Sequence, residues 1–246
     1  MAGCQPVAGK GIEQGIKMKY CIIDTSDKRI TEQMQLLGFK CISIIASDCV
    51  SPPICRHADV LYKKLNQNTI IASECQKANF PLLEKLGYRI IVNDKLKPGY
   101  KTESYLNYIY NDDYIIYNPK TAQKPPLEFL INKQEITVKQ GYTGCSTITV
   151  TEKAYITDDE GIYKTITNNY IDCLLIPKGD IKLEGYDYGF IGGASVKLNK
   201  NEIQFFGDFT DKKAKHNVVE FLSKYNITAQ FIENMKLTDI GSAIIL

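Results

Sequence analysis

Along this chain, segments with the apolar spacing of a helix alternate with short apolar runs of strand length. Five times, a helix-like segment ends at Gly or Asn and passes directly into such a run. The five junction residues are Gly38, Gly87, Asn132, Asn169 and Asn226. Gly and Asn tolerate the left-handed conformation that closes a helix. The pattern therefore predicts five repeated units, each with a helix that leads into a strand.

Upstream of four of these helices the pattern predicts a β-hairpin, because turn-forming residues separate two strand-like runs. The paired ranges are 57–65 with 69–73, 105–110 with 113–118, 145–151 with 153–158, and 193–199 with 201–208. Each unit therefore has the order β-β-α-β.

The first unit lacks one strand. Its helix, about 28–37, follows a single strand at 19–24, whereas the final segment 241–246 resembles the first strand of a hairpin. We expect the C-terminal strand to pair with 19–24 and close a ring without exposed edges. The alternative is a doubly wound α/β sheet, in which the two segments need not pair. Residues 18–246 are expected to form one domain, after a loosely held tail at 1–17.

Composition and charge limit the functional classes to which the chain can belong. The 246 residues are 44% hydrophobic, and the formal net charge of +2 gives no support to a nucleic-acid or membrane-surface role. No apolar run approaches the length of a membrane span. Several of the eight cysteines lie in apolar runs and no signal peptide is evident, so we expect reduced thiols and a cytoplasmic location.

Three short motifs carry a resemblance to a known fold. They are Gln140-Gly141-Tyr142-Thr143-Gly144-Cys145-Ser146-Thr147, Ile191-Gly192-Gly193-Ala194-Ser195-Val196 and Thr238-Asp239-Ile240-Gly241-Ser242-Ala243. They are similar to a bacterial family assigned to the pentein fold, a five-bladed α/β propeller of β-β-α-β units. Guanidino-modifying enzymes such as arginine deiminases, agmatine deiminases and dimethylargininases have this fold, as does the non-catalytic ribosome anti-association factor. The resemblance covers roughly residues 18–246, and it is architectural.

The resemblance also implies a catalytic pattern that this chain matches only in part. The enzymes use a Cys near the end of the chain, a His in a His-x-Asp motif, and acidic residues that hold the guanidinium group. His57-Ala58-Asp59 matches the motif, although it lies earlier in the chain than is usual. Gly241 and Ser242 stand where the Cys is expected. This departure predicts that deiminase activity is absent.

Equivalent positions of the five units suggest a ligand pocket. Aligning the first strands superposes a small or polar residue in each unit: Asp59, Asn107, Ser146, Ser195 and Ser242. We expect these side chains to line a polar pocket in a central channel. The Gly-rich stretch 178–193 is a candidate for a loop that covers the channel. The alternative is that small residues are simply what fits a crowded axis.

Cys145 and His57 are the candidates for chemistry. Cys145 could attack as a nucleophile, His57 could move protons, and Asp59, two residues along the same strand, could hold a positive charge. A structural histidine and an inert thiol are the alternatives. Cys49, Cys55 and His57 do not have a standard zinc spacing, so neither a metal nor a cofactor is expected. His216 lies opposite an apolar helix face and is expected at the surface.

Three functions remain open. The first is binding of a small polar or cationic ligand in the channel without deiminase activity. The second is a hydrolase or amidino-group enzyme that uses Cys145 and His57. The third is a scaffold whose outer helices bind another protein.

Overall fold

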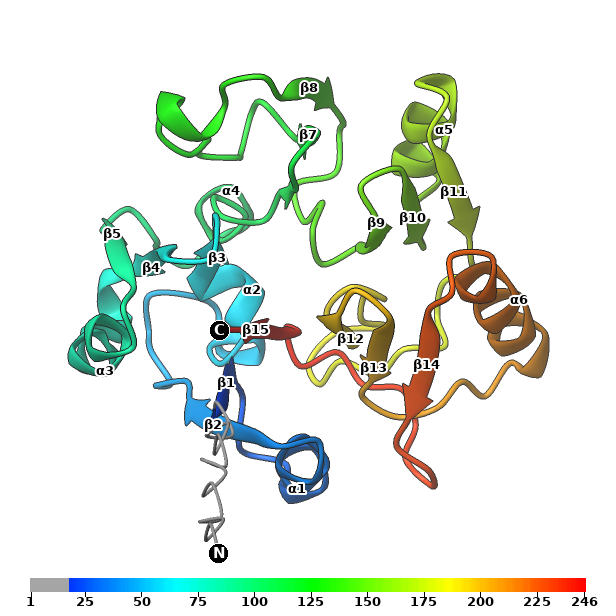
Figure 1. The fold of residues 1–246 in the computed structure, drawn as a ribbon, viewed down its shortest axis with the longest axis horizontal. Coiled ribbons are helices and arrows are strands. Elements are labelled where there is room, and N and C mark those ends of the chain that lie inside the picture. The colour runs from blue at the N-terminus through cyan, green and yellow to red at the C-terminus, as the bar shows by residue number, and fades with distance from the viewer. Residues whose placement is uncertain (1–17) are drawn as a thin grey trace, which may run out of the picture.

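Five three-stranded sheets surround a common axis in the computed structural model, which describes residues 18–246 (Figure 1). Each sheet has the same topology, because its first strand runs antiparallel to the second and the second runs parallel to the third. The predicted fold class is thereby confirmed. The tail predicted at 1–17 lies outside the described residues.

Each unit contributes one sheet of three strands. The five sheets are β15 (Ala243–Ile245), β1 (Lys19–Ile23) and β2 (Phe39–Ser43); β3 (Tyr62–Lys64), β4 (Thr69–Ser73) and β5 (Arg89–Asn93); β6 (Ile109–Tyr110), β7 (Tyr114–Tyr117) and β8 (Gln134–Thr137); β9 (Thr147–Thr151), β10 (Ala154–Thr157) and β11 (Asp172–Leu175); and β12 (Ser195–Asn199), β13 (Glu202–Phe205) and β14 (Thr228–Phe231). All four predicted hairpins are present, and every strand in them except β4 is shorter than predicted.

A helix makes the parallel crossover in four of the five units, as such a connection usually requires. These helices are α1 (Lys28–Leu36), α3 (Phe80–Lys85), α5 (Glu160–Asn168) and α6 (Lys212–Ser223). The third unit departs from the prediction, because only the 3-10 turn Leu127–Phe129 lies between β7 and β8. Three prolines precede this turn, Pro119, Pro125 and Pro126. Proline lacks the backbone N–H donor that a helix needs.

The helix-to-strand junctions have the predicted backbone in four units. Gly38, Gly87, Asn132 and Asn226 all have positive φ. In the fourth unit the prediction was wrong by one residue: Asn169 has φ −93°, and Tyr170, at φ 58°, makes the left-handed turn. The Asn169 side chain instead donates to the Thr165 carbonyl of the preceding helical turn. Tyr170 is fully exposed, so its ring meets no neighbour there.

The C-terminal strand closes the ring. β15 pairs antiparallel with β1, from Cys21 opposite Ile245 to Ile23 opposite Ala243. Both segments lie in the first sheet, although they come from opposite ends of the chain (Figure 1). The doubly wound alternative is therefore wrong, and the first unit is completed by the last strand.

Short helices precede the first strands of two units, and the earlier of these helices lies where the sequence predicted the strand 57–65. α2 (Ala58–Leu61) precedes β3, and α4 (Tyr100–Glu103) precedes β6. His57 is the N-cap of α2, and its carbonyl accepts from Leu61 N at 3.2 Å, so His57 and Asp59 do not share a strand face as expected. Instead, Asp59 N donates to Gly241 O at 2.9 Å, which ties α2 to the turn before β15.

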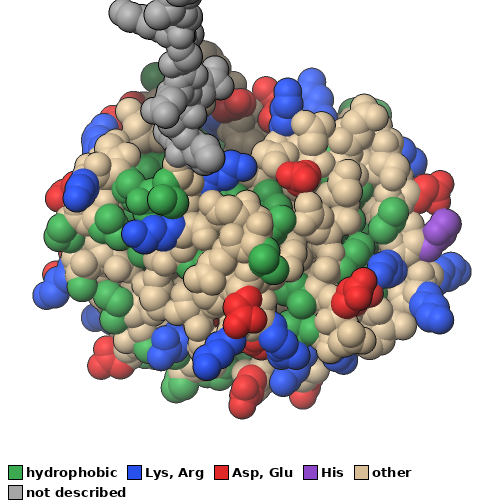
Figure 2. Space-filling model, turned by 60° about the horizontal axis from the view of Figure 1, so that its bottom comes forward, with side chains coloured by type: hydrophobic (Ala, Val, Ile, Leu, Met, Phe, Trp, Pro, Cys, Tyr) green, Lys and Arg blue, Asp and Glu red, His purple; other side chains and the backbone are tan. Residues whose placement is uncertain are grey.

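Apolar side chains of the sheets pack against the crossover helices. In the largest cluster, Val218, Phe221 and Leu222 of α6 pack with Ile203 and Phe205 of β13. On the face drawn in Figure 2, basic and acidic side chains are interspersed between small apolar groups. Within residues 18–246 no helix combines the length and the apolar character needed to cross a membrane.

Candidate ligand-binding site

Two backbone turns meet at the centre of the ring. A Cβ atom at Gly192 would lie 2.3 Å from the Gly144 carbonyl oxygen, so only glycine allows this approach. Gly193 N donates to the Cys145 carbonyl at 3.1 Å. These contacts join the turn that precedes β9 to the turn that precedes β12.

One cavity of about 450 Å³, which we call the aromatic pocket, contains both Cys145 and His57. Its walls come from α2, from residues 140–145 and from the loop between β11 and β12. They are Ile54, His57, Val60, Tyr100, Gln140, Tyr142, Cys145, Leu183, Tyr186, Asp187, Tyr188, Phe190 and Asp239. The Gly-rich stretch 178–193 therefore supplies one side of this pocket.

The aromatic rings form a continuous wall. The Tyr100 and Tyr142 ring centroids are 5.4 Å apart in an edge-to-face arrangement. The ring centroid of Phe190 lies 6.1 Å from that of Tyr142 and 6.2 Å from that of Tyr188. Such contacts hold each ring in place and leave ring faces available to a ligand.

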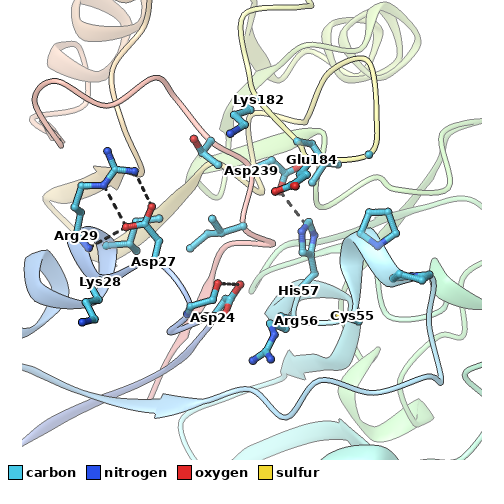
Figure 3. Close-up of a pocket in the computed structure, with 18 residues that line it drawn as sticks. Asp24, Asp27, Lys28, Arg29, Cys55, Arg56, His57, Lys182, Glu184 and Asp239 are labelled. Carbon is cyan, nitrogen blue, oxygen red and sulfur yellow. Dashed lines mark hydrogen bonds and ion pairs between the residues drawn. The ribbon is translucent and has the colours of Figure 1, made fainter.

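A buried His–Asp pair borders the pocket. His57 Nδ1 lies 3.8 Å from Asp239 Oδ1, and both side chains are almost fully buried (Figure 3). The Asp239 carboxylate also accepts from Phe190 N and Gly241 N, each at 2.9 Å. Burial raises the pKa of Asp239, and the nearby His57 opposes that increase. The carboxylate is thus fixed in position by backbone donors.

His57 and Asp239 also border a larger cavity of about 830 Å³. Its walls carry charges of both signs, including Asp24, Arg56, Lys182 and Glu184 (Figure 3). An organic ligand in the aromatic pocket would therefore have polar space beside it.

Cys145 is buried and hydrogen-bonded on two sides. Its Sγ donates to Asp59 Oδ2 at 2.8 Å and accepts from Asn107 Nδ2 at 2.7 Å. Asn107 Oδ1 also accepts from Cys145 N at 2.9 Å. Burial raises the pKa of the Cys145 thiol, and the negative charges of Asp59 and Asp239 raise it further. The sulfur therefore stands as a neutral thiol beside carboxylates.

The residues predicted for the site fall into three places. Cys145 and His57 line the aromatic pocket. Asp59, Ser195 and Ser242 line a separate cavity of about 450 Å³. Asn107 and Ser146 are fully buried; Asn107 holds Cys145, and Ser146 Oγ has no hydrogen-bond partner. Ligand contact by each of these side chains stays a prediction.

The position that the resemblance assigns to a nucleophile is occupied differently here. Gly241 has φ 72°, and a Cβ atom there would lie 2.3 Å from His57 Cβ. Only glycine is accommodated at this position without moving His57.

The sequence interpretation missed two groups. Asp239 lies in the quoted motif 238–243, two residues before Gly241, which was its only signal. The aromatic wall gave no signal as a group in the sequence, because its rings come from separate segments. His216 is exposed on α6, as predicted, 3.8 Å from Glu220. Among residues 18–246, no group of three or more His, Cys, Asp or Glu side chains is placed to hold a metal ion.

Solved structures with a similar fold are guanidino-modifying enzymes. An agmatine deiminase from C. jejuni aligns over 89% of this chain and 91% of its own, with a TM-score of 0.54 and 10% identity. An amidinotransferase from Microseira wollei aligns over 89% of both chains, with a TM-score of 0.56 and 8% identity. The enzyme DDAH from Pseudomonas aeruginosa aligns over 87% and 92%, with a TM-score of 0.52 and 7% identity.

These likenesses show the pentein fold, since identities this low carry fold information alone. A comparison with curated proteins gives no match. The model of a family of unknown function, DUF6873, matches residues 22–244. The chain is therefore a pentein-fold member of the DUF6873 family.

Proposed function

We propose that this protein binds a small organic cation of the guanidinium class in the aromatic pocket, without deiminase chemistry. The observation that carries the proposal is the Asp239 carboxylate, buried beside a wall of aromatic rings. Ring faces attract organic cations, and a desolvated carboxylate supplies a charge partner and hydrogen-bond acceptors. The fold of the similar enzymes supports a guanidinium rather than a simple ammonium ligand.

Two features support the absence of deiminase chemistry. Gly241 stands where a nucleophilic Cys would be expected, and His57 Cβ occupies the space that a side chain there would need. Cys145, the thiol in the pocket, has its pKa raised by burial and by Asp59. A protonated thiol is a poor nucleophile at neutral pH.

The binding test compares three ligands of similar shape at constant ionic strength. Butylguanidinium carries charge and N–H donors, butyltrimethylammonium carries charge alone, and butylurea carries donors without charge. A ligand that binds only the folded state raises the melting temperature, and at equal concentration the tighter ligand raises it more. We expect saturable stabilisation in the order butylguanidinium, butyltrimethylammonium, butylurea. Equal shifts for all three, or no shift, would refute the proposal.

A matched pair of variants locates the site. Asp239→Asn should weaken butylguanidinium at least about tenfold, since truncating a buried charge partner costs more than about 1.4 kcal/mol. Asp187→Asn removes an exposed carboxylate from the rim of the same pocket and should change affinity less than about twofold. Tyr188→Leu removes one ring without touching the buried pair, and it should also weaken binding. Unchanged affinity in both Asp239→Asn and Tyr188→Leu would place the cation elsewhere.

A thiol hydrolase is the second candidate, because Cys145 and His57 line the same pocket. It predicts conversion of butylguanidinium to butylurea and ammonium, abolished by Cys145→Ser. Binding without product favours the first proposal. A reducing, cytoplasmic location fits the second candidate, because that candidate requires Cys145 as a free thiol.

A further inference from the structure

A second cavity of about 450 Å³ shares no lining residue with the aromatic pocket. It lies beside Gly144 and Gly192, and its walls come from β3, β9, β12 and β15. Three of its lining residues are lysines: Lys63 and Lys64 on β3, and Lys197 on β12. We call this cavity the lysine pocket.

Each lysine is held by the edge of a neighbouring unit. Lys63 Nζ donates to Tyr108 O at 2.7 Å, and Lys64 Nζ donates to Ile245 O at 2.8 Å. Lys197 Nζ donates to Val150 O. An ammonium group has three N–H donors, so two remain on each lysine after these bonds. The fold therefore positions the three charges, and each ammonium group keeps N–H donors that are free to bind a ligand.

The positive charges are not neutralised by direct ion pairs. None of the three lysines forms a salt bridge with a carboxylate of residues 18–246. Asp59 is the one acidic residue among those lining the cavity, so three positive charges and one negative charge leave a net charge of +2. Asp59 Oδ2 already accepts a hydrogen bond from the Cys145 thiol. Burial lowers the pKa of all three lysines, as expected for charges without a full counter-charge.

We propose that the lysine pocket binds a compact anion with two or more negative charges, of the phosphate or dicarboxylate class. A lysine ammonium is a point charge, which suits compact anions approached from several sides. The half-buried setting strengthens the attraction relative to an exposed lysine cluster. Two negative charges match the net charge of the cavity.

The test titrates inorganic phosphate and succinate separately into the wild-type protein, with NaCl adjusted to constant ionic strength. Binding is followed by isothermal titration calorimetry. We expect saturable binding of at least one anion, and the two titrations distinguish phosphate from dicarboxylate ligands. Absence of saturable binding by both would overturn the proposal.

Two variants and one control locate the anion. Lys197→Met and Lys64→Met should each weaken binding about tenfold or more. Lys200→Met, in the exposed turn between β12 and β13, should leave it unchanged. Equal weakening by all three would indicate a general charge effect and would contradict the pocket. Butylguanidinium binding should be unaffected by Lys197→Met, which separates this proposal from the one for the aromatic pocket.

A measurement on the wild-type chain covers the case in which a lysine variant does not fold. Acetylation of individual lysines by an activated acetyl ester is followed by mass spectrometry with and without the bound anion. Bound anion should slow acetylation of Lys64 and Lys197 at least about fivefold and leave Lys200 unchanged. Equal rates with and without the anion at Lys64 and Lys197 would contradict the proposal.

Discussion

The aromatic pocket and the lysine pocket are of similar size, yet they differ in charge. One combines aromatic rings with the Asp239 carboxylate, and the other combines three lysines with a single carboxylate. Neighbouring residues separate them: Cys145 lines the aromatic pocket, whereas Gly144 and Asp59 line the lysine pocket. The fold thus supplies equivalent positions around an axis, and side-chain identity gives each cavity its charge.

The region between the two pockets is closely packed because glycines allow backbone and side chains to approach closely. Gly192 meets the turn at Gly144, and Gly241 meets His57. Cys145 and Asp59 are joined by a hydrogen bond across the same region.

The largest effect is expected from Gly241→Ala. Its left-handed φ costs a side chain about 1 to 2 kcal/mol, and contact with His57 adds roughly 1 to 3 kcal/mol. The free energy of unfolding in urea should therefore fall by about 3 kcal/mol. Gly179→Ala is the matched control, since it has φ 98° but no atom within 4 Å of the added Cβ, and it should cost only about 1 to 2 kcal/mol. Equal losses would mean that His57 moves aside freely.

Asp158 makes stability depend on pH. Its Oδ2 accepts from Ile191 N at 3.1 Å beside the central turn, and burial raises its pKa to about 7. Because the folded-state pKa is above the unfolded value of 3.8, the folded state binds more protons between these values, and stability is lost as pH rises through about 7. Asp158→Asn removes this loss.

Urea unfolding of wild type and Asp158→Asn at pH 5 and pH 8.5 measures the effect. The variant should gain stability relative to wild type on going to pH 8.5, by roughly 2 kcal/mol or more. Asp180→Asn serves as the control, because Asp180 is half-exposed rather than buried. The same pH dependence in all three proteins would exclude Asp158 as its source.

Cys145 should resist alkylation. In the folded protein at pH 7.5, iodoacetamide should modify it at least about a hundredfold more slowly than in urea, because the thiol is buried and protonated. Asp59→Asn removes an adjacent negative charge and should speed the reaction about tenfold. The half-buried Cys55 provides an internal reference in the same digest. Fast alkylation of Cys145 in the wild type would instead support the hydrolase candidate.

His216→Ala should have the smallest effect. This histidine is exposed on α6 and lines neither pocket, and its contact with Glu220 is a surface pair. The free energy of unfolding should change by less than about 0.5 kcal/mol, with no change in binding of either ligand. A larger change in binding would show that the outer helices are coupled to the pockets.

The fold was predictable because its signals are local and repeated. Gly38 and Gly87 close helices at the predicted places, and residues 241–246 pair with the first strand. The errors arose where local chemistry competes with the repeat. Prolines leave the third unit without an α-helix, and the short helix α2 replaces the start of a predicted strand.

The site was less predictable, because its chemistry depends on contacts between distant segments. The interpretation singled out Cys145 and His57, which do share a pocket. It could not foresee that Asp59 would bond to the Cys145 sulfur from a different cavity, since that contact joins residues 86 positions apart. Nor does any pattern along the chain bring Tyr100, Tyr142 and Phe190 together.

If the proposed function is right, the aromatic pocket binds a guanidinium cation and leaves it chemically unchanged. A single ¹H NMR titration of butylguanidinium into the wild-type protein, followed for a day at pH 7.5, reports both binding and turnover. We expect saturable broadening of the butyl resonances, loss of that broadening in Asp239→Asn, and no butylurea. Accumulation of butylurea, or spectra unaffected by the protein, would contradict it.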